Sequence, residues 1–192
     1  MIFNLGIFTQ LGIAVAFGST WFLPSVSNQG YSPEQPIPFN HKQHAGENKI
    51  ECLYCHADVE RSRHASVPSI NVCMNCHLVV QAASPHIQKL RDALAQGKPI
   101  QWVRVHELAD YVYFTHKRHI ARGLACEDCH GDVKKMDKIE QVAPLTMGWC
   151  MDCHRGKTTP KRILSKYYSE AAELNGHMNG SVAPTSCTTC HN

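Results

Sequence analysis

The chain has 192 residues, among them ten cysteines and 13 histidines, and its formal net charge is +3. The charge is small, and neither a basic tail nor a nucleic-acid recognition motif is present, which argues against nucleic acid as a partner. Serine–histidine–aspartate and metal–carboxylate constellations of recognisable spacing are also missing from the sequence, which argues against enzymes of those classes.

The first 27 residues are predicted to form a membrane anchor. Residues 2–23 contain no charged side chain, and the first one along the chain is Glu34. About 20 apolar residues suffice for a helix to cross the core of a bilayer. A cleaved signal peptide is the alternative, but a basic leading region and a short apolar core are both missing. Small residues at helical spacing, such as Gly12 and Ala16, favour packing against a neighbouring protein helix.

All ten cysteines fall into five pairs of one form, Cys-x-x-Cys followed directly by histidine. A zinc site or a redox dithiol also uses a Cys-x-x-Cys pair, but neither requires the histidine that follows. The pattern is that of c-type haem attachment, in which two thioethers hold the porphyrin and the histidine ligates the iron. We therefore predict five covalently bound haems c. The motifs, numbered 1 to 5 in chain order, are Cys52/Cys55/His56, Cys73/Cys76/His77, Cys126/Cys129/His130, Cys150/Cys153/His154 and Cys187/Cys190/His191.

A second pattern, Phe-x-His-x-x-His, precedes motifs 1 and 3. It occurs at residues 39–44 and again at residues 114–119. Histidines three apart lie on one face of a turn or short helix, so both could reach the haem cluster from one segment. A polar surface turn is the alternative, but duplication ahead of a haem motif favours ligation. The candidates for second axial ligands are His41, His44, His116 and His119.

The duplication extends over whole two-haem modules. CHADVE at motif 1 matches CHGDVK at motif 3, and VPSINVCMNCH matches APLTMGWCMDCH at motifs 2 and 4. This is an internal repeat on the scale of a module. We expect an anchor at 1–27 and a pentahaem domain at 28–192. The domain would hold modules at about 39–97 and 114–157, with the fifth haem in 158–192.

Five haems on a chain of this length would supply much of the buried apolar surface. The expected fold class is a multihaem cytochrome c: a single N-terminal transmembrane helix plus a haem-packed domain of short helices and irregular loops, with little sheet. Residues 84–97 predict a capped helix with Pro85 at its first position and Gly97 after its end. A brief extended segment is expected at 98–105 and a helix at 158–176.

The Phe-x-His-x-x-His pattern before Cys-x-x-Cys-His resembles the class III multihaem cytochromes, which are small periplasmic electron carriers. The resemblance implies that the first histidine of each pair ligates the haem just downstream, while the second reaches a different haem. By that rule His41 would serve motif 1 and His116 motif 3, with His44 and His119 serving other haems. The whole chain is similar to the pentahaem cytochrome subunit of the bacterial alternative complex III.

One distal ligand then remains to be found, and two candidates stay open. His64 lies nine residues before Cys73, and Met147 lies three residues before Cys150. A thioether ligand would raise the potential of its haem above that of a bis-histidine haem. Weaker candidates are Met136, His106, His177 and Met178, whereas His86 is interpreted as ordinary helix surface.

An electron relay is favoured over an enzyme, because eight histidines outside the motifs are available for five distal positions and reduction of a small substrate needs an open one. A small membrane-anchored quinol dehydrogenase is a third hypothesis, but such proteins place their first haem close after the anchor. Covalent haem attachment places residues 28–192 on the periplasmic side of a bacterial inner membrane. The expected partners are quinol-oxidising and iron–sulfur subunits, with a soluble cytochrome c or a terminal oxidase as acceptor.

Overall fold

The computed structural model describes residues 9–10, 12–15, 27–158 and 183–191. Within these residues, no helix has both the length and the apolar character needed to cross a membrane. Most of the predicted anchor lies outside them, and so does almost all of the predicted helix at 158–176. The described residues of the anchor region are helical, and Ile13 and Val15 are exposed.

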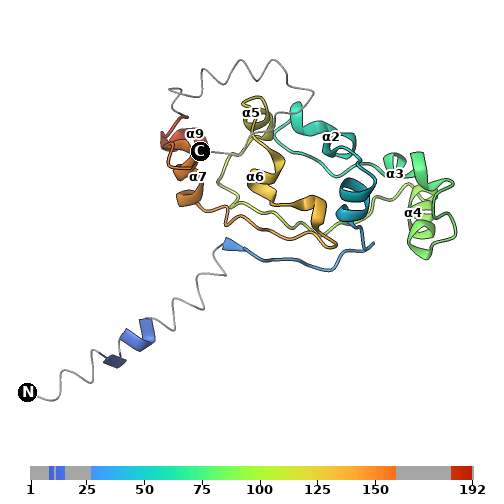
Figure 1. Ribbon diagram of the computed structural model, residues 1–192, viewed down its shortest axis with the longest axis horizontal. Helices are drawn as coiled ribbons and strands as arrows, with labels where there is room; N and C mark the ends of the chain where they lie inside the picture. The colour runs from blue at the N-terminus through green and yellow to red at the C-terminus, as the bar shows by residue number, and fades with distance from the viewer. Residues whose placement is uncertain (1–8, 11, 16–26, 159–182, 192) are drawn as a thin grey trace, which may run out of the picture.

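Short helices joined by irregular loops make up the described chain, which confirms the predicted fold of the haem domain (Figure 1). The elements are η1 (Lys42–Glu47), α2 (Cys52–Cys55), η2 (Ala57–Glu60), α3 (Ile70–His77), α4 (Pro85–Ala95), α5 (His116–Ile120), α6 (Cys126–His130), η3 (Val133–Lys135), α7 (Met147–His154) and α9 (Cys187–Cys190). Pairing between strands in this part of the chain is limited to an isolated antiparallel bridge between Val112 and His191.

The sequence repeat is also a structural repeat. α3 and α7 both begin three residues before the first cysteine of their motif and end on its histidine. Motifs 1 and 3 are followed by the matching 3₁₀ turns η2 and η3. The two modules therefore share their local structure, even though most of their residues differ.

The modules pack against each other in a reciprocal way. η1, which directly follows His41 and contains His44, packs against η3 of the second module, and the Lys42 amide donates to the Met136 carbonyl at 3.0 Å. α5, which carries the second pair, packs against η2 of the first module. There the His116 amide donates to the Arg63 carbonyl at 3.2 Å. Each histidine pair is thus held by the turn that follows the other module's leading motif.

Helix α4 forms as predicted and covers α3. Ser84 caps it by accepting a hydrogen bond from the His86 amide at 3.3 Å, Pro85 occupies the first turn, and Gly97 beyond its end has a φ of +64°. With α3 it builds a small hydrophobic cluster of Ile37, Met74, Ile87 and Leu90. This is a small core for such a chain, as expected if haems complete the interior.

Residues 98–105 form no strand. The Gln35 side chain nevertheless pairs with this segment as a strand would, because its amide donates to the Val103 carbonyl and accepts from the Val103 amide, both at 2.9 Å. Gln141, which is fully buried, ties its own segment to two others. Its side chain donates to the carbonyls of Ser27 and Ala143 and accepts from the Glu107 amide.

Candidate haem sites

Each motif places its two cysteines on one helical turn. The turns belong to α2, α3, α6, α7 and α9, and cysteines three apart on a helix lie on the same face. None of the ten cysteines forms a disulfide bond, and each is half-buried or exposed. Both sulfurs of a motif are therefore directed to one side, as attachment to the edge of one porphyrin requires.

The ten cysteines differ in their exposure. Cys76, Cys153 and Cys187 are exposed, whereas the other seven are half-buried. The Cys153 sulfur also lies 3.1 Å from the Thr158 hydroxyl, a contact that the motif does not predict. The physical reason is that the polypeptide alone covers only one side of these turns, so a porphyrin would have to cover the other. A thioether sulfur can still accept from a hydroxyl, so haem attachment at Cys153 stays a prediction.

Four of the five motif histidines have their Nδ1 fixed by a backbone carbonyl. Because a carbonyl oxygen only accepts, Nδ1 carries the proton, and the Nε2 lone pair is left for a metal. The histidine pairs show the same arrangement, with acceptor carbonyls on Asn40, Arg63 and Thr115. The contacts are His56–Ser66 (2.6 Å), His77–Val80 (2.9 Å), His154–Pro184 (2.7 Å), His191–Tyr111 (3.4 Å), His44–Asn40 (2.8 Å), His116–Arg63 (2.9 Å) and His119–Thr115 (2.9 Å).

The phenylalanine of the repeated pattern positions both histidines of its pair. Phe39 meets His41 edge-on, with ring centroids 4.8 Å apart, and stacks on His44 at 4.4 Å. Phe114 meets His116 and His119 at the same two separations. Because one aromatic ring contacts one imidazole by its edge and the other by its face, the two histidines are turned in different directions. A pair oriented in this way can serve two different haems.

Three pairs of imidazoles lie at the separation that one iron between them requires. With metal–nitrogen bonds of about 2.0 Å and about 1.1 Å from nitrogen to ring centre, two axial imidazoles have centroids about 6.2 Å apart. The observed separations are 6.1 Å for His44–His77, 6.3 Å for His116–His130 and 6.3 Å for His119–His154. The residues therefore fit haems with two histidine ligands at motifs 2, 3 and 4.

The haem of motif 1 has His41 as the neighbouring candidate. Burial lowers the pKa of His41 to about 4, and the nearby His56 is the next largest cause. The ring is thus neutral, as an iron ligand must be. Its buried Nδ1 has no hydrogen-bond partner, unlike the equivalent atom of His116.

His106 is the residue whose position the sequence did not reveal. It is packed edge-on against His130, with centroids 4.4 Å apart, which is too close for an iron to lie between the two rings. Its Nε2 is buried without a hydrogen-bond partner. Burial, followed by His106 and His116, lowers the pKa of His130 to about 3. A single histidine in an otherwise unpatterned stretch gave no signal of this burial.

The two open candidates for the last distal ligand lie on the surface. His64 is exposed, and its backbone amide donates to the Ser62 hydroxyl at 3.1 Å. Met147 opens α7 and is 66% exposed. Within the described residues, His191 of motif 5 has a ring contact with Tyr111, at 5.6 Å, rather than with a second histidine. His177 and Met178 lie outside those residues, so the distal ligand of motif 5 stays a prediction.

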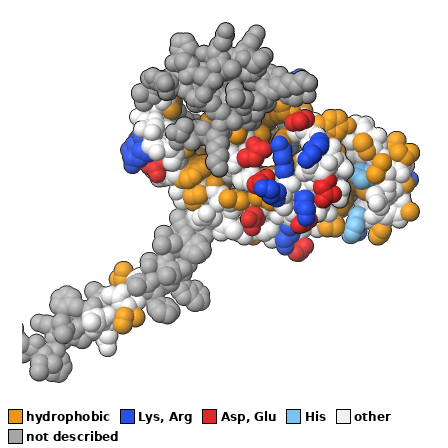
Figure 2. All heavy atoms as spheres, viewed as in Figure 1, with side chains coloured by type: hydrophobic (Ala, Val, Ile, Leu, Met, Phe, Trp, Pro, Cys, Tyr) orange, Lys and Arg blue, Asp and Glu red, His pale blue; other side chains and the backbone are white. Residues whose placement is uncertain are grey.

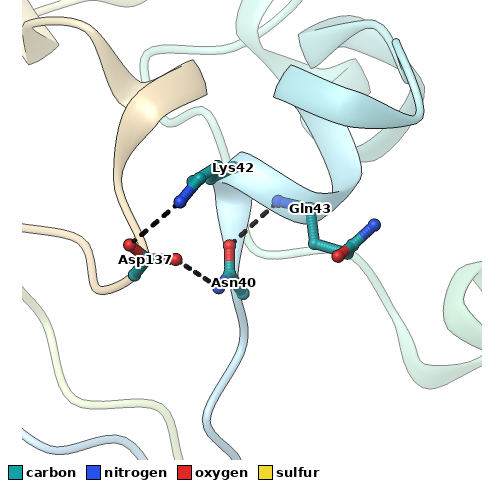
Figure 3. A network of polar contacts seen from close by, with 4 residues as sticks. All are labelled: Asn40, Lys42, Gln43 and Asp137. Atoms are coloured by element: carbon teal, nitrogen blue, oxygen red, sulfur yellow. Dashed lines mark hydrogen bonds and ion pairs between the residues drawn. The ribbon is translucent and has the colours of Figure 1, made fainter.

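A polar network fixes the first histidine pair to the second module (Figure 3). The Asn40 side chain donates to Asp137 at 2.9 Å and accepts from the Gln43 amide at 2.9 Å. Lys42 forms an ion pair with the same Asp137 carboxylate at 3.6 Å. Since the Asn40 carbonyl also accepts from His44, this network sets the direction of that imidazole.

Charges of both signs alternate over the middle of the molecule (Figure 2). Three lysines that follow motif 3 pair with carboxylates: Lys134 with Glu127, Lys135 with Asp132 and Lys138 with Glu34. These pairs are exposed, and such pairs contribute little to stability. Each of these lysines therefore has a carboxylate as its neighbour.

Comparison with known families agrees with the geometry. Residues 23–110 match the class III cytochrome C family, and residues 112–192 match the family described as cytochrome c7 and related cytochrome c. The boundary falls between the two modules. Together with the motifs, these matches define a multihaem cytochrome c, helical with little sheet, that carries covalently bound c-type haem.

A curated relative aligns with nearly the whole chain. It is the multihaem cytochrome c subunit of a menaquinone reductase from Nitratidesulfovibrio vulgaris, strain Hildenborough. The two sequences are 29% identical over 199 aligned residues, which cover 96% of this chain and 88% of the relative. This chain is thus similar to a cytochrome subunit over its full length, beyond the haem motifs themselves.

Proposed function

We propose that this chain is the electron-transfer subunit of a membrane-bound, quinone-linked respiratory complex, in which it relays electrons through five haems c. The observation that carries the proposal is the set of three histidine pairs 6.1–6.3 Å apart. Two protein ligands on one iron leave no axial position for a substrate. Such a centre is suited to passing electrons rather than to binding a molecule for reduction.

When bound, each haem supplies one-electron chemistry, because its iron alternates between the ferric and ferrous states. At motifs 2 and 4 the chain's residues would hold both axial imidazoles in one tautomer through hydrogen bonds to backbone carbonyls. Burial keeps His41 and His130 neutral. Ligands fixed in this way need little rearrangement when an electron arrives or leaves.

Quinone chemistry would belong to a partner subunit. Oxidation of a quinol releases two electrons and two protons, and this chain would carry the electrons away one at a time. The full-length likeness to a cytochrome subunit of a menaquinone reductase supports a quinone-linked assembly. The partners would be quinone-reactive and iron–sulfur subunits, with a soluble cytochrome c or a terminal oxidase beyond them. Residues 1–27 would anchor the chain in the inner membrane with its haems in the periplasm.

The direction of electron flow has two candidates. Likeness to the alternative complex III subunit favours quinol oxidation, with electrons leaving through this chain. The name of the curated relative favours the reverse direction, in which menaquinone takes up two electrons and two protons. Bis-histidine haems serve either direction, so the partner subunits decide between them.

The test uses gently solubilised membranes and affinity capture of the full chain. We expect membrane subunits with a quinone site to copurify. The intact complex should exchange electrons rapidly between the haems and a menaquinol analogue, whereas the isolated chain in liposomes should do so at a negligible rate. Fast, inhibitor-sensitive reduction of the isolated chain by the quinol would overturn the proposal, because the chain would then hold the quinone site itself.

A further inference from the structure

We propose that the five motifs form a line in space in the order 2–1–3–4–5, so that the haems of motifs 2 and 5 are the two ends of the relay. The meaning of this order rests on the proposed function, whereas the order itself rests on contacts between motifs. Figure 1 shows α3 and α4 at one end of the haem domain, α7 and α9 at the other, and α2, α5 and α6 between them.

Motifs 2 and 1 are direct neighbours. Asn75, inside motif 2, donates its side-chain amide to the hydroxyl of Tyr54, inside motif 1, at 2.9 Å. His44 also joins the two, since it lies on the turn that leads into motif 1 and its ring is 6.1 Å from that of His77. One short turn thus offers His41 to one haem and His44 to the next.

Motifs 1 and 3 meet at the centre. The Lys42 amide, before motif 1, donates to the Met136 carbonyl, after motif 3, at 3.0 Å, and the Lys117 amide, before motif 3, donates to the Ser62 carbonyl, after motif 1, at 3.2 Å. These bonds accompany the reciprocal packing of η1 on η3 and of α5 on η2. A haem attached at Cys52 and one attached at Cys126 must therefore approach each other at the junction of the modules.

Motifs 3 and 4 are joined by α5 in the way that η1 joins motifs 1 and 2. Its His116 ring lies 6.3 Å from His130 of motif 3, and its His119 ring lies 6.3 Å from His154 of motif 4. Histidines three residues apart on one helix cannot reach irons that are far from each other. The haems of motifs 3 and 4 must be adjacent.

Motif 5 extends the line beyond motif 4. The His154 imidazole of motif 4 donates to the Pro184 carbonyl, just before motif 5, at 2.7 Å. On its other side, motif 5 contacts the segment that leads into α5, where the Tyr113 amide donates to the Cys190 carbonyl at 2.7 Å. Its neighbours thus belong to the second module, and α3 of motif 2 lies at the opposite end (Figure 1).

The order explains why the repeat is useful. Two equivalent modules meeting through motifs 1 and 3 give the run 2–1–3–4, whose two ends are alike. Motif 5 is added at one end only and makes the ends different. A relay needs such a difference if it is to accept electrons from one partner and deliver them to another.

The test uses the full five-haem protein with one added thiol. All native cysteines would be bound to haem, so Val79→Cys beside motif 2, or Thr185→Cys beside motif 5, provides a unique site for a nitroxide. Val79 is 81% exposed and Thr185 is exposed. Each ferric haem speeds the relaxation of a nitroxide with a steep dependence on distance, and pulsed electron paramagnetic resonance measures that relaxation.

Removing the haem of motif 2 by Cys73→Ala and Cys76→Ala should slow relaxation several-fold at position 79 and leave position 185 unchanged. Removing the haem of motif 5 by Cys187→Ala and Cys190→Ala should do the reverse. If removal of either haem slowed relaxation equally at positions 79 and 185, the proposed order would be wrong, and the five haems would form a compact cluster instead. That result would not contradict the relay function, provided that the parent protein holds five haems and all of them are low-spin.

Should a haem-deleted protein fail to fold, His44→Met and His119→Met keep all five haems. A methionine ligand raises the potential of its haem. Partial reduction then converts that haem alone to the ferrous state. Low-spin ferrous iron is diamagnetic, so this haem no longer speeds the relaxation of the nitroxide. We expect His44→Met to slow relaxation mainly at position 79, and His119→Met mainly at position 185. Loss of this selectivity would contradict the order.

Discussion

The imidazole rings of His116 and His130 have centroids 6.3 Å apart and planes only 7° from parallel. His130 belongs to motif 3, and His116 comes from the helix before it, where the Arg63 carbonyl of the other module holds its Nδ1 at 2.9 Å. The separation matches two ligands on one iron, and the hydrogen bond fixes which nitrogen faces that iron. This candidate ligand pair is therefore held by residues of both modules.

Removal of this distal ligand should open one haem of five. In His116→Ala we expect the haem content to stay at five per chain, because attachment depends on the cysteines. One haem should become high-spin and bind about one carbon monoxide per chain, since an axial position is then free. Absorption spectra of the reduced protein measure both changes.

The matched control is His86→Ala, which removes an exposed histidine on α4. It should leave all five haems low-spin and carbon monoxide unbound. A His116→Ala protein that behaves like this control would contradict the assignment of His116 as a ligand.

Much of the local structure could be predicted from the sequence, because its signals are local. The helical turns at the motifs follow from the Cys-x-x-Cys-His spacing, and α4 follows from Ser84, Pro85 and Gly97. The repeated pattern at 39–44 and 114–119 predicted two similar segments, and the ring contacts of Phe39 and Phe114 with their histidines match. Each of these inferences needed only residues close together in the chain.

The pairings between modules could not be predicted in the same way. These pairings depend on how distant segments of the chain pack together. Examples are the approach of His44 to His77 and the packing of η1 on η3. The burial of His106 against His130 depends on the same packing. Local spacing does not contain this information.

Acid should release axial ligands only at low pH. The folded-state pKa values of His41 and His130, about 4 and about 3, lie below the ordinary value of 6.5. The unfolded chain therefore takes up protons between pH 6.5 and about 4 that the folded chain does not, so stability falls as pH falls through this window. The folded protein should stay low-spin at about pH 5 and become partly high-spin below about pH 4.

A spectrophotometric acid titration measures the spin change, and denaturant unfolding at about pH 7 and about pH 5 measures the stability change. We expect a lower unfolding midpoint at the lower pH with the same native spectrum. A low-spin to high-spin change centred near pH 6.5, without unfolding, would show that these histidines are not protected by burial.

A side chain added at Gly46 should destabilise the contact between the two modules. A Cβ there would collide with the Lys134 carbonyl oxygen, a backbone atom that cannot easily move. We expect Gly46→Ala to lower the free energy of unfolding by about 1–3 kcal/mol through overpacking. Gly148→Ala in α7 is the control, because nothing lies within 4 Å of its Cβ position. Equal melting temperatures for the two variants would argue against the η1–η3 contact.

The unmodified protein should bind little carbon monoxide in its reduced state. Both axial positions are predicted to be occupied by the chain at each haem, so all five should be low-spin. Electron paramagnetic resonance of the oxidised protein measures the high-spin fraction. A substantial high-spin signal in intact protein would instead support an enzyme that binds a small substrate at an open haem.

The haem content of the purified chain tests the central claim most directly. Protein denatured in alkaline pyridine reports haem c by its absorption, and amino-acid analysis of the same sample reports the chain. We predict five haems per chain, all resistant to extraction with acidified acetone because ten cysteines hold them covalently. A ratio of four or fewer, or zinc in place of iron, would contradict the account.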